Sequence, residues 1–379
     1  MLKRTPLFAA HQKLGARLVE FGGWEMPVQY SSIMDEHLAV RKAAGLFDIS
    51  HMGELRFTGP GALAFLNQCL TNDLRKLNVG LAQYTLMCNE AGGVIDDLYA
   101  YRTGEQEFLL VVNASRIEAD VAWLEKRLAA WPQRSQVVFE NASDRFGAVA
   151  LQGPRAVEFI DACFPGPSTG GTQVARASEL LKNQFGVFSL NGKTVYLART
   201  GYTGEDGFEV IAPAEIVESI WDKLLAVGHA YCLQPAGLGA RDTLRTEVCY
   251  PLYGHELDEH TTPLEAGLGS FVALEKGDFV GRAVLVEQKA KGVAKKCVAF
   301  KVAEKAAPPR PHYPIWSSGA NPAKVGEVVS GTQSPSLGTG IGMGYVPAAL
   351  AKAGSSIEIE VRGRRVPALI VTKPIYRKI

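Results

Sequence analysis

Two adjacent acids are candidate catalytic residues because they follow a glycine pair inside an otherwise apolar segment. The segment reads Gly92-Gly93-Val94-Ile95-Asp96-Asp97-Leu98. The glycines predict a turn and the apolar residues predict a strand, in which neighbouring side chains point to opposite faces. Asp96 and Asp97 therefore cannot share one environment. One could lie at the surface or cap a turn while the other points into a cavity and does chemistry there.

A second candidate segment, residues 199–209, places tyrosine, threonine and acidic residues among three glycines. This composition predicts a tight loop between strands. Tyr202 could be packed there for its apolar area alone. Alternatively, Tyr202 could stack on a flat, nitrogen-rich heterocycle whose amino and amide groups donate to a glutamate of the segment. Both interpretations stay open at this point.

A third candidate is Arg241, which follows the glycines of the segment PAGLGARD. Glycines permit close backbone approach, and the planar guanidinium suits a carboxylate or a carbonyl. Arg241 could equally form a buried ion pair with Asp242 or Glu247. His51, in the segment FDISHMGE, is either a base or a structural hydrogen-bond donor. These residues alone indicate a cavity enzyme or a binding protein for a heterocycle that bears carboxylates.

The elements that must position these residues alternate between helix and strand over most of the chain. Ser32 and Asp35 form an S-x-x-D pattern that opens a predicted helix, which Gly45 ends. Asn113 is a plausible cap in front of a later helix. Periodicity predicts strands at 54–58, 108–112, 137–139 and 148–151 and helices at 63–70, 117–131 and 216–228.

The hydrophobic pattern of the sequence changes beyond about Asp278. Helical periodicity fades, and short apolar runs are separated by proline and glycine. Residues 357–361 and 366–370 alternate around Gly363, which predicts a hairpin. A separate, mostly β C-terminal domain is therefore expected.

Composition limits the classes of function. The chain has 379 residues, 47% of them apolar and 21% charged, so we expect two or three globular domains. Its net charge of +1 provides no overall field for nucleic acid or a membrane surface. The six cysteines form no C-x-x-C pair, so we expect no metal site. No apolar run approaches the roughly 20 residues that span a bilayer, and the N-terminus shows no apolar leader segment. We therefore expect a cytoplasmic protein, bacterial or, in a processed form, from an organelle matrix.

Many motifs occur in one order from Arg4 to Arg377, and together they resemble the T-protein family of the glycine cleavage system, the aminomethyltransferases. The motifs include RTPL, FGGWEMPVQY, AVRKAAGLFDISHMGE, MCNEAGGVIDDL, RTGYTGEDGFE, PAGLGARDTLR, SGTQSPSLG and KPIYR.

The resemblance implies an α+β fold of three domains in a clover-leaf around a central folate cavity. Roughly residues 1–275 would form the folate-binding region, as two interleaved α+β subdomains (1–50 with 140–275, and 51–139). Residues 276–379 would form a C-terminal β-barrel.

The resemblance also implies the reaction and its partners. A methylene group would pass from an aminomethyl arm on the lipoylated H-protein to tetrahydrofolate, with release of ammonia and of the dihydrolipoyl carrier. Tetrahydrofolate is then the one-carbon acceptor, with no metal and no flavin involved and no nucleic acid or membrane as partner. Asp97 matches the family's catalytic aspartate. The matching folate-binding positions are Tyr84, Asn113, Tyr202, Glu209, Arg241, Tyr250 and Tyr376.

Relatives of the same architecture have other functions, and these are the alternative functions for this chain. Some are halves of flavin-dependent demethylating dehydrogenases, and others demethylate sulfonium compounds. A non-catalytic alternative is a folate-binding accessory protein of iron–sulfur metabolism or tRNA modification. The joint presence of Asp97, Tyr202, Glu209 and Arg241 favours the transferase.

Overall fold

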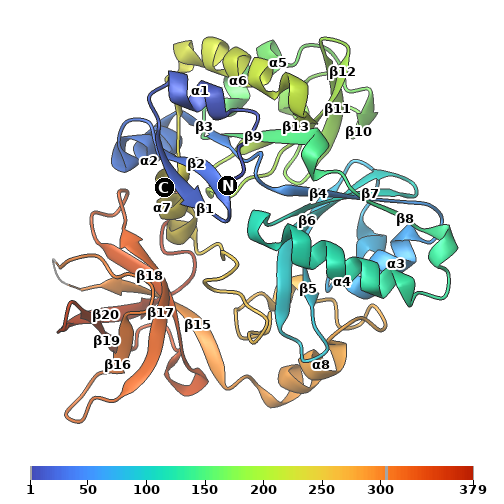
Figure 1. Cartoon of the computed structure of the whole chain (residues 1–379). Coiled ribbons are helices and arrows are strands. Elements are labelled where there is room, and N and C mark those ends of the chain that lie inside the picture. The colour runs from blue at the N-terminus through green and yellow to red at the C-terminus, as the bar shows by residue number, and fades with distance from the viewer. Residues whose placement is uncertain (1, 304–305, 379) are drawn as a thin grey trace. The chain divides into compact units, whose positions relative to one another are not determined.

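The computed structural model describes residues 2–303 and 306–378 and divides into two compact units. The first unit comprises the chain up to Met87 together with Asp96–Arg241. The second comprises Cys88–Ile95 together with the chain from Asp242 onward. Two large β-sheets with their helices make up most of the first unit, and a closed β-barrel forms most of the second (Figure 1).

A seven-stranded sheet in the first unit has the order β10-β11-β12-β13-β9-β3-β14. Its neighbours are antiparallel except for the parallel pair of β3 and β14. The strands are β3 (Ala44–Asp48), β9 (Phe146–Gln152), β10 (Gly170–Gly171), β11 (Phe185–Leu190), β12 (Lys193–Ala198), β13 (Gly207–Pro213) and β14 (Leu233–Pro235).

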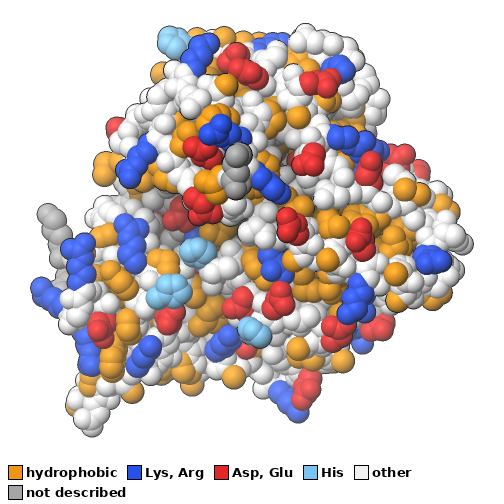
Figure 2. Space-filling view, in the orientation of Figure 1, with side chains coloured by type: hydrophobic (Ala, Val, Ile, Leu, Met, Phe, Trp, Pro, Cys, Tyr) orange, Lys and Arg blue, Asp and Glu red, His pale blue; other side chains and the backbone are white. Residues whose placement is uncertain are grey.

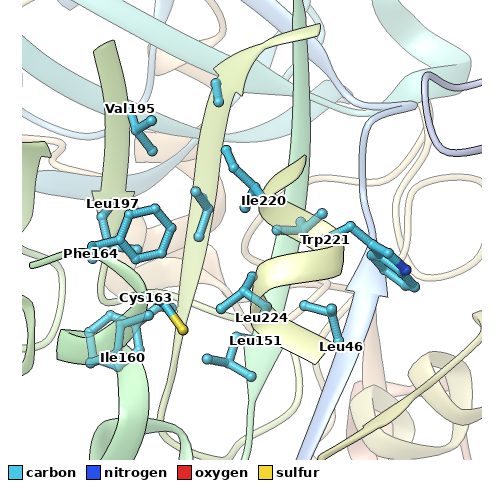
Figure 3. Packing of buried hydrophobic residues seen from close by; sticks show 14 of the residues in the cluster. Leu46, Leu151, Ile160, Cys163, Phe164, Val195, Leu197, Ile220, Trp221 and Leu224 are labelled. Carbon is cyan, nitrogen blue, oxygen red and sulfur yellow. The ribbon is translucent and has the colours of Figure 1, made fainter. Parts of the chain in front are cut away.

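The main core of the first unit lies between this sheet and its helices. Helix α6 (Ala214–Gly228) buries its apolar stripe against the sheet, and α5 (Ala156–Cys163) packs beside it. Figure 3 shows the α6 side chains close to Leu46 of β3 and Leu151 of β9. Each buried side chain of this size contributes roughly 1.5–3 kcal/mol, so this packing holds the sheet rigid.

The helix predicted from Ser32 is α2 (Ile33–Lys42), and the Ser32 hydroxyl accepts from the Asp35 amide at 3.1 Å as the capping pattern predicts. The predicted end at Gly45 is wrong. Ala44 and Gly45 already belong to β3, where they pair with β14 and leave the helix no room to continue.

The second large sheet of the first unit has the order β5-β6-β7-β4-β8. One face carries the helices α3 (Ala62–Cys69) and α4 (Ile117–Ala129), and Phe57 packs there on Phe139 and Phe65, with ring centroids 4.6 and 5.9 Å apart. The strands are β4 (Gly53–Thr58), β5 (Ala82–Cys88), β6 (Val94–Gly104), β7 (Glu107–Val112) and β8 (Val138–Asn141).

The alternation along β6 separates the two acids. Ala100 is paired with Leu110 of β7, and Leu110 is paired with Leu55 of β4, so the three side chains lie on one face of the sheet. Leu55 shares this face with Phe57, which packs on α3, so the even-numbered residues of β6 face the helices. Asp96 lies on that helix-covered face, and Asp97 lies on the opposite face.

The second unit contains a closed barrel in the order β15-β18-β17-β16-β19-β20, which confirms the predicted β-rich C-terminal region. Its apolar interior includes Phe300, Ile315 and Ile359, and the predicted hairpin is formed by the last two strands. The strands are β15 (Lys295–Val302), β16 (Pro314–Ser317), β17 (Lys324–Gln333), β18 (Gly340–Pro347), β19 (Ser356–Val361) and β20 (Arg364–Val371).

One helix of this unit is missing from the sequence prediction. Helix α8 (Arg282–Lys291) lies in the region where helical periodicity fades. Leu285 is its buried residue, so its apolar stripe is too short to produce a periodic signal.

No helix in the described part of the chain is long and apolar enough to cross a membrane. Figure 2 shows acidic and basic side chains mixed over the visible face, in keeping with the net charge of +1.

Candidate active site

Asp97 is buried, with 9% of its surface exposed, and two neutral donors hold its carboxyl group. The Tyr84 hydroxyl donates to Oδ2 at 2.8 Å, and the Asn113 amide Nδ2 donates to Oδ1 at 3.0 Å. Tyr84 lies on β5 and Asn113 follows β7, so both strands that flank β6 contribute a donor. The three residues therefore form one compact group.

The environment of Asp97 changes its acidity. Burial raises the pKa of Asp97 to about 7, and the charge of Asp96 adds to this rise. The hydrogen bonds from Tyr84 and Asn113 oppose the shift only in part. Because this pKa lies near neutrality, the carboxyl group can both take up and release a proton under physiological conditions.

The sequence allowed one of the two acids to lie at the surface or to cap a turn, and this expectation is wrong for Asp96. It is fully buried on the helix-covered face. Its oxygens accept from the backbone N–H of Asn113 at 3.0 Å and from the amide Nδ2 at 2.8 Å. The Asn113 side chain makes no cap hydrogen bond at the helix that follows, and its Nδ2 donates to the two aspartates.

A second carboxylate, Glu209 on β13, is half-buried and tethered. The Thr200 hydroxyl donates to its Oε2 at 2.5 Å, and the Tyr101 hydroxyl lies 3.4 Å from that of Thr200. Tyr101 is on β6 with Asp97, four residues further along and on the same face. A chain of side chains thus links the strand of Asp97 to the strand of Glu209.

The loop that carries Tyr202 is ordered by buried polar contacts. Gln152 donates to the Thr200 carbonyl at 3.1 Å and accepts from the Thr203 hydroxyl at 2.9 Å. A Cβ at Gly201 would lie 1.9 Å from the Gln152 side chain, so this position has space only for glycine. Arg41 fixes the other side of the loop by donating to the Thr203 carbonyl at 2.7 Å.

Arg241 lies next to Tyr202, with its guanidinium carbon 4.6 Å from the ring centroid. This distance is typical of a cation–π contact. Gly237, one turn earlier, has no space for a Cβ, which would lie 2.4 Å from the Val28 carbonyl oxygen. The predicted close backbone approach at these glycines is therefore confirmed. The start of α7 (Leu238–Val248) packs directly against the backbone of β2 (Trp24–Gln29).

The two acids considered as ion-pair partners of Arg241 make the following contacts. Asp242 pairs with Arg245, at 2.6 Å, and Glu247 accepts from Ser334 and Ser336.

His51 is fully enclosed rather than poised as a base. Its ring contacts Phe21 edge-on, with centroids 5.7 Å apart. Burial lowers the pKa of His51 to about 4; Asp48 opposes this shift and Arg241 reinforces it. The ring is therefore neutral and only a weak base at physiological pH, while its Nδ1 has no hydrogen-bond partner among the described residues, so a part as structural donor stays a prediction.

Tyr250 and Tyr376 lie in the second unit. Their backbone N–H groups donate to the carbonyls of Arg245 and Glu247, at 3.0 and 2.8 Å, so both are anchored at the end of α7. The structure brings Tyr84, Asp97, Asn113, Tyr202, Glu209 and Arg241 into the first unit. A part in the site for Tyr250 and Tyr376 stays a prediction.

Four polar residues near these groups were not identified from the sequence: Tyr101, Asp120, Gln152 and Thr200. Tyr101 had a signal, since it shares the odd-numbered face of β6 with Asp97. Gln152 and Thr200 act through side-chain contacts between distant segments, which no local pattern reports. Among residues 2–303 and 306–378, no group of three or more His, Cys, Asp or Glu side chains could hold a metal ion.

Comparison with known proteins agrees with this architecture. Residues 7–276 match the family model described as the GCVT N-terminal domain, and residues 295–377 match the glycine cleavage T-protein C-terminal barrel domain. An aminomethyltransferase of Bacillus cytotoxicus is 46% identical over 382 residues, covering 100% of this chain and 99% of that protein. One of Desulfitobacterium hafniense is 43% identical over 380 residues, with the same coverage.

A solved structure is similar over nearly the whole length. The crystal structure of glycine cleavage system aminomethyltransferase T from Bartonella henselae aligns with a TM-score of 0.89 at 34% identity, covering 99% of this chain and 98% of that chain. With both family models matched in order and relatives of this identity over the full length, the chain belongs to the glycine cleavage T-protein family, the aminomethyltransferases.

Proposed function

We propose that the chain transfers the methylene carbon of the aminomethyl group on lipoylated H-protein to tetrahydrofolate. The carbon–sulfur and carbon–nitrogen bonds of the aminomethyl arm break, and two carbon–nitrogen bonds to the folate form. The two N–H hydrogens that the folate gives up end on the ammonia and on the dihydrolipoyl thiol. Atoms and charge therefore balance without an oxidant or a metal ion as co-reactant.

The observation that carries this proposal is the environment of Asp97. As a folate nitrogen attacks the aminomethyl carbon, positive charge develops on that nitrogen. A carboxylate fixed by Tyr84 and Asn113 stabilises this charge without having to reorganise. An ordinary aspartate, with a pKa of about 3.9, would be a poor proton acceptor. The pKa of about 7 makes Asp97 able to take the proton as well as to position the nitrogen.

We propose that the pterin ring binds between Glu209 and Tyr202. Glu209, oriented by Thr200, would accept from the pterin amino and ring N–H groups. Tyr202 and the Arg241 guanidinium stacked on it would provide a flat wall. Tyr84 and Asn113 would line the side nearest the reacting nitrogen, and Tyr250 and Tyr376 are proposed as further folate contacts.

The test is ammonia release from aminomethyl-loaded H-protein, with and without tetrahydrofolate. We expect strong folate-dependent release by the native protein, and a loss of about 10²–10⁴-fold in Asp97→Asn, where the carboxylate is gone but the shape is kept. Asp222→Asn, an exposed aspartate of α6, is the matched control and should retain full activity.

The same assay separates the alternatives. If tetrahydrofolate binds but no ammonia appears, the transferase proposal fails, and a different one-carbon donor or a non-catalytic folate-binding role takes its place. If release is folate-dependent but equal in Asp97→Asn, the reaction stands and the role of Asp97 is wrong.

A further inference from the structure

Asp120 is a buried acid that the proposed reaction does not use. It lies in the first turn of α4, where an acid ordinarily faces solvent, yet it is fully buried. Ile117, Asp120 and Leu124 form the buried stripe of this helix. An apolar residue at this position would complete the stripe, so the carboxyl group costs stability unless a partner compensates for its burial.

The neighbour of Asp120 is Asp96, whose carboxyl group is close enough to affect its acidity. Both oxygens of Asp120 are buried and accept from no N–H or hydroxyl group of the described residues, so a proton shared with Asp96 is the compensation that remains. A hydrogen bond between two carboxyl groups requires a proton, because ionised carboxylates only accept. Asp96, in contrast, accepts twice from Asn113. The donors therefore favour a charged Asp96 and leave the proton on Asp120.

The electrostatics agree with this assignment. Burial raises the pKa of Asp120 to about 11, and the charge and the hydrogen bond of Asp96 add to the rise. Arg116 opposes it, and Asp97 adds a further small increase. At neutral pH the Asp96–Asp120 pair thus holds one proton and one negative charge.

We propose that Asp120 is a positioning residue for the one-carbon transfer: its protonated carboxyl group fixes Asp96, and Asp96 orients the Asn113 amide that holds Asp97. The contacts form a continuous chain. Asp120 donates to Asp96, Asp96 accepts from Asn113 Nδ2 at 2.8 Å, and the same nitrogen donates to Asp97 at 3.0 Å. Asp120 touches no reacting atom. This inference rests on the proposed role of Asp97.

Two substitutions of Asp120 should behave oppositely. Asp120→Asn keeps a donor to Asp96 and the charge of the pair, so its pH profile and its kcat should match those of the native protein. Asp120→Leu completes the apolar stripe and should fold, but it removes the donor. Asp96 then takes up the proton more readily, and less negative charge remains beside Asp97. The acid limb of the pH–rate profile should move to lower pH.

Asp120→Leu should also lower the rate, because Asp96 then orients the Asn113 amide less firmly. Because misplacement of a reacting group costs rate steeply, kcat of Asp120→Leu should fall by about tenfold, with little change in the KM for tetrahydrofolate. A merely structural role for Asp120 would lower the yield of folded protein without moving the acid limb.

A measurement without substrates separates this inference from the proposed function. Infrared spectra of the whole protein labelled with ¹³C-aspartate, recorded at about pH 9, should show the C=O stretch of a protonated aspartate, since this pH lies between the pKa values of Asp97 and Asp120. The label excludes Glu54, a buried acid whose pKa burial also raises. The band should vanish in Asp120→Asn.

Three results together would support the positioning role of Asp120. Loss of the band in Asp120→Asn, a native pH profile in that variant and a shifted acid limb in Asp120→Leu would support it. A band that persists in Asp120→Asn would show that Asp120 carries no proton and would overturn it. An unshifted limb in Asp120→Leu would also overturn it. If the native protein releases no ammonia, the proposed function fails, while the infrared result still decides where the proton lies.

Discussion

Buried carboxylates occur in both units, but their surroundings differ. In the second unit, Glu247 accepts from Ser334 at 2.5 Å and twice from Ser336, at 3.1 and 2.9 Å. In the same unit, Glu256 pairs with the buried Arg245 at 3.2 Å. In the first unit, Asp96 and Asp97 share the single amide of Asn113, and Asp120 lies beside Asp96.

The difference shows how one residue type serves two purposes. A buried carboxylate with several donors, or with a cation, is held in place and fixes the fold. Carboxyl groups that share few donors compete for protons, and their pKa values separate. The first arrangement ties α7 to the barrel of the second unit, and the second makes Asp97 titratable near neutrality.

The largest predicted effect tests the structural side of this comparison. Arg245→Met leaves Glu256 buried without its cation, so the free energy of unfolding should fall by about 3–5 kcal/mol. Urea titration followed by fluorescence measures this change. Lys324→Met, an exposed cation at the start of β17, is the control and should change stability little. Equal stability of both variants would contradict the view that Arg245 compensates for a buried charge.

A second prediction concerns Glu209. Glu209→Ala should weaken tetrahydrofolate binding by about one to two orders of magnitude, because a charge-assisted hydrogen bond contributes about 1.5–3 kcal/mol. Calorimetric titration gives the affinity directly. Glu215→Ala, an exposed glutamate in the first turn of α6, is the matched control. Unchanged affinity in Glu209→Ala would remove Glu209 from the proposed site.

The smallest effect concerns the tether of Glu209. Thr200→Val keeps the shape but removes the donor to Oε2, so the KM for tetrahydrofolate should rise about three- to tenfold while kcat changes little. Thr200→Ser restores the hydroxyl and should restore the KM. If serine and valine behave alike, the hydroxyl does not position Glu209.

The sequence was sufficient for the family, the α+β class, the barrel and the aminomethyltransferase activity, all of which the comparisons confirm. Patterns with a local cause predicted well. Ser32 caps α2 through its neighbour Asp35, and the hairpin of β19 and β20 follows from strict alternation. The subdomain limits within the first 275 residues and the cytoplasmic location stay predictions.

What the sequence could not provide depends on contacts between distant residues. The adjacent acids suggested that one of them was exposed, but both are buried: Asp96 on the helix-covered face of β6 and Asp97 on the opposite face. With the ordinary pKa of an aspartate, Asp97 would be a poor proton acceptor, and it is its burial together with the charge of Asp96 that raises this pKa. The proposed role of Asp120 could not be predicted from the sequence, because it depends on the neighbouring side chain of Asp96, which lies on another element of the fold.

The central claim is that burial among few donors tunes Asp97 to titrate near neutrality, and its direct test is the titration of that carboxyl group. Carbon NMR of ¹³C-aspartate-labelled protein, with Asp97→Asn to assign the signal, measures its pKa. We expect about 7, with ammonia release lost as the pH falls through that value, because the ionised form is the active one. A midpoint near the ordinary value of about 4, or a rate that does not follow the titration, would contradict the claim.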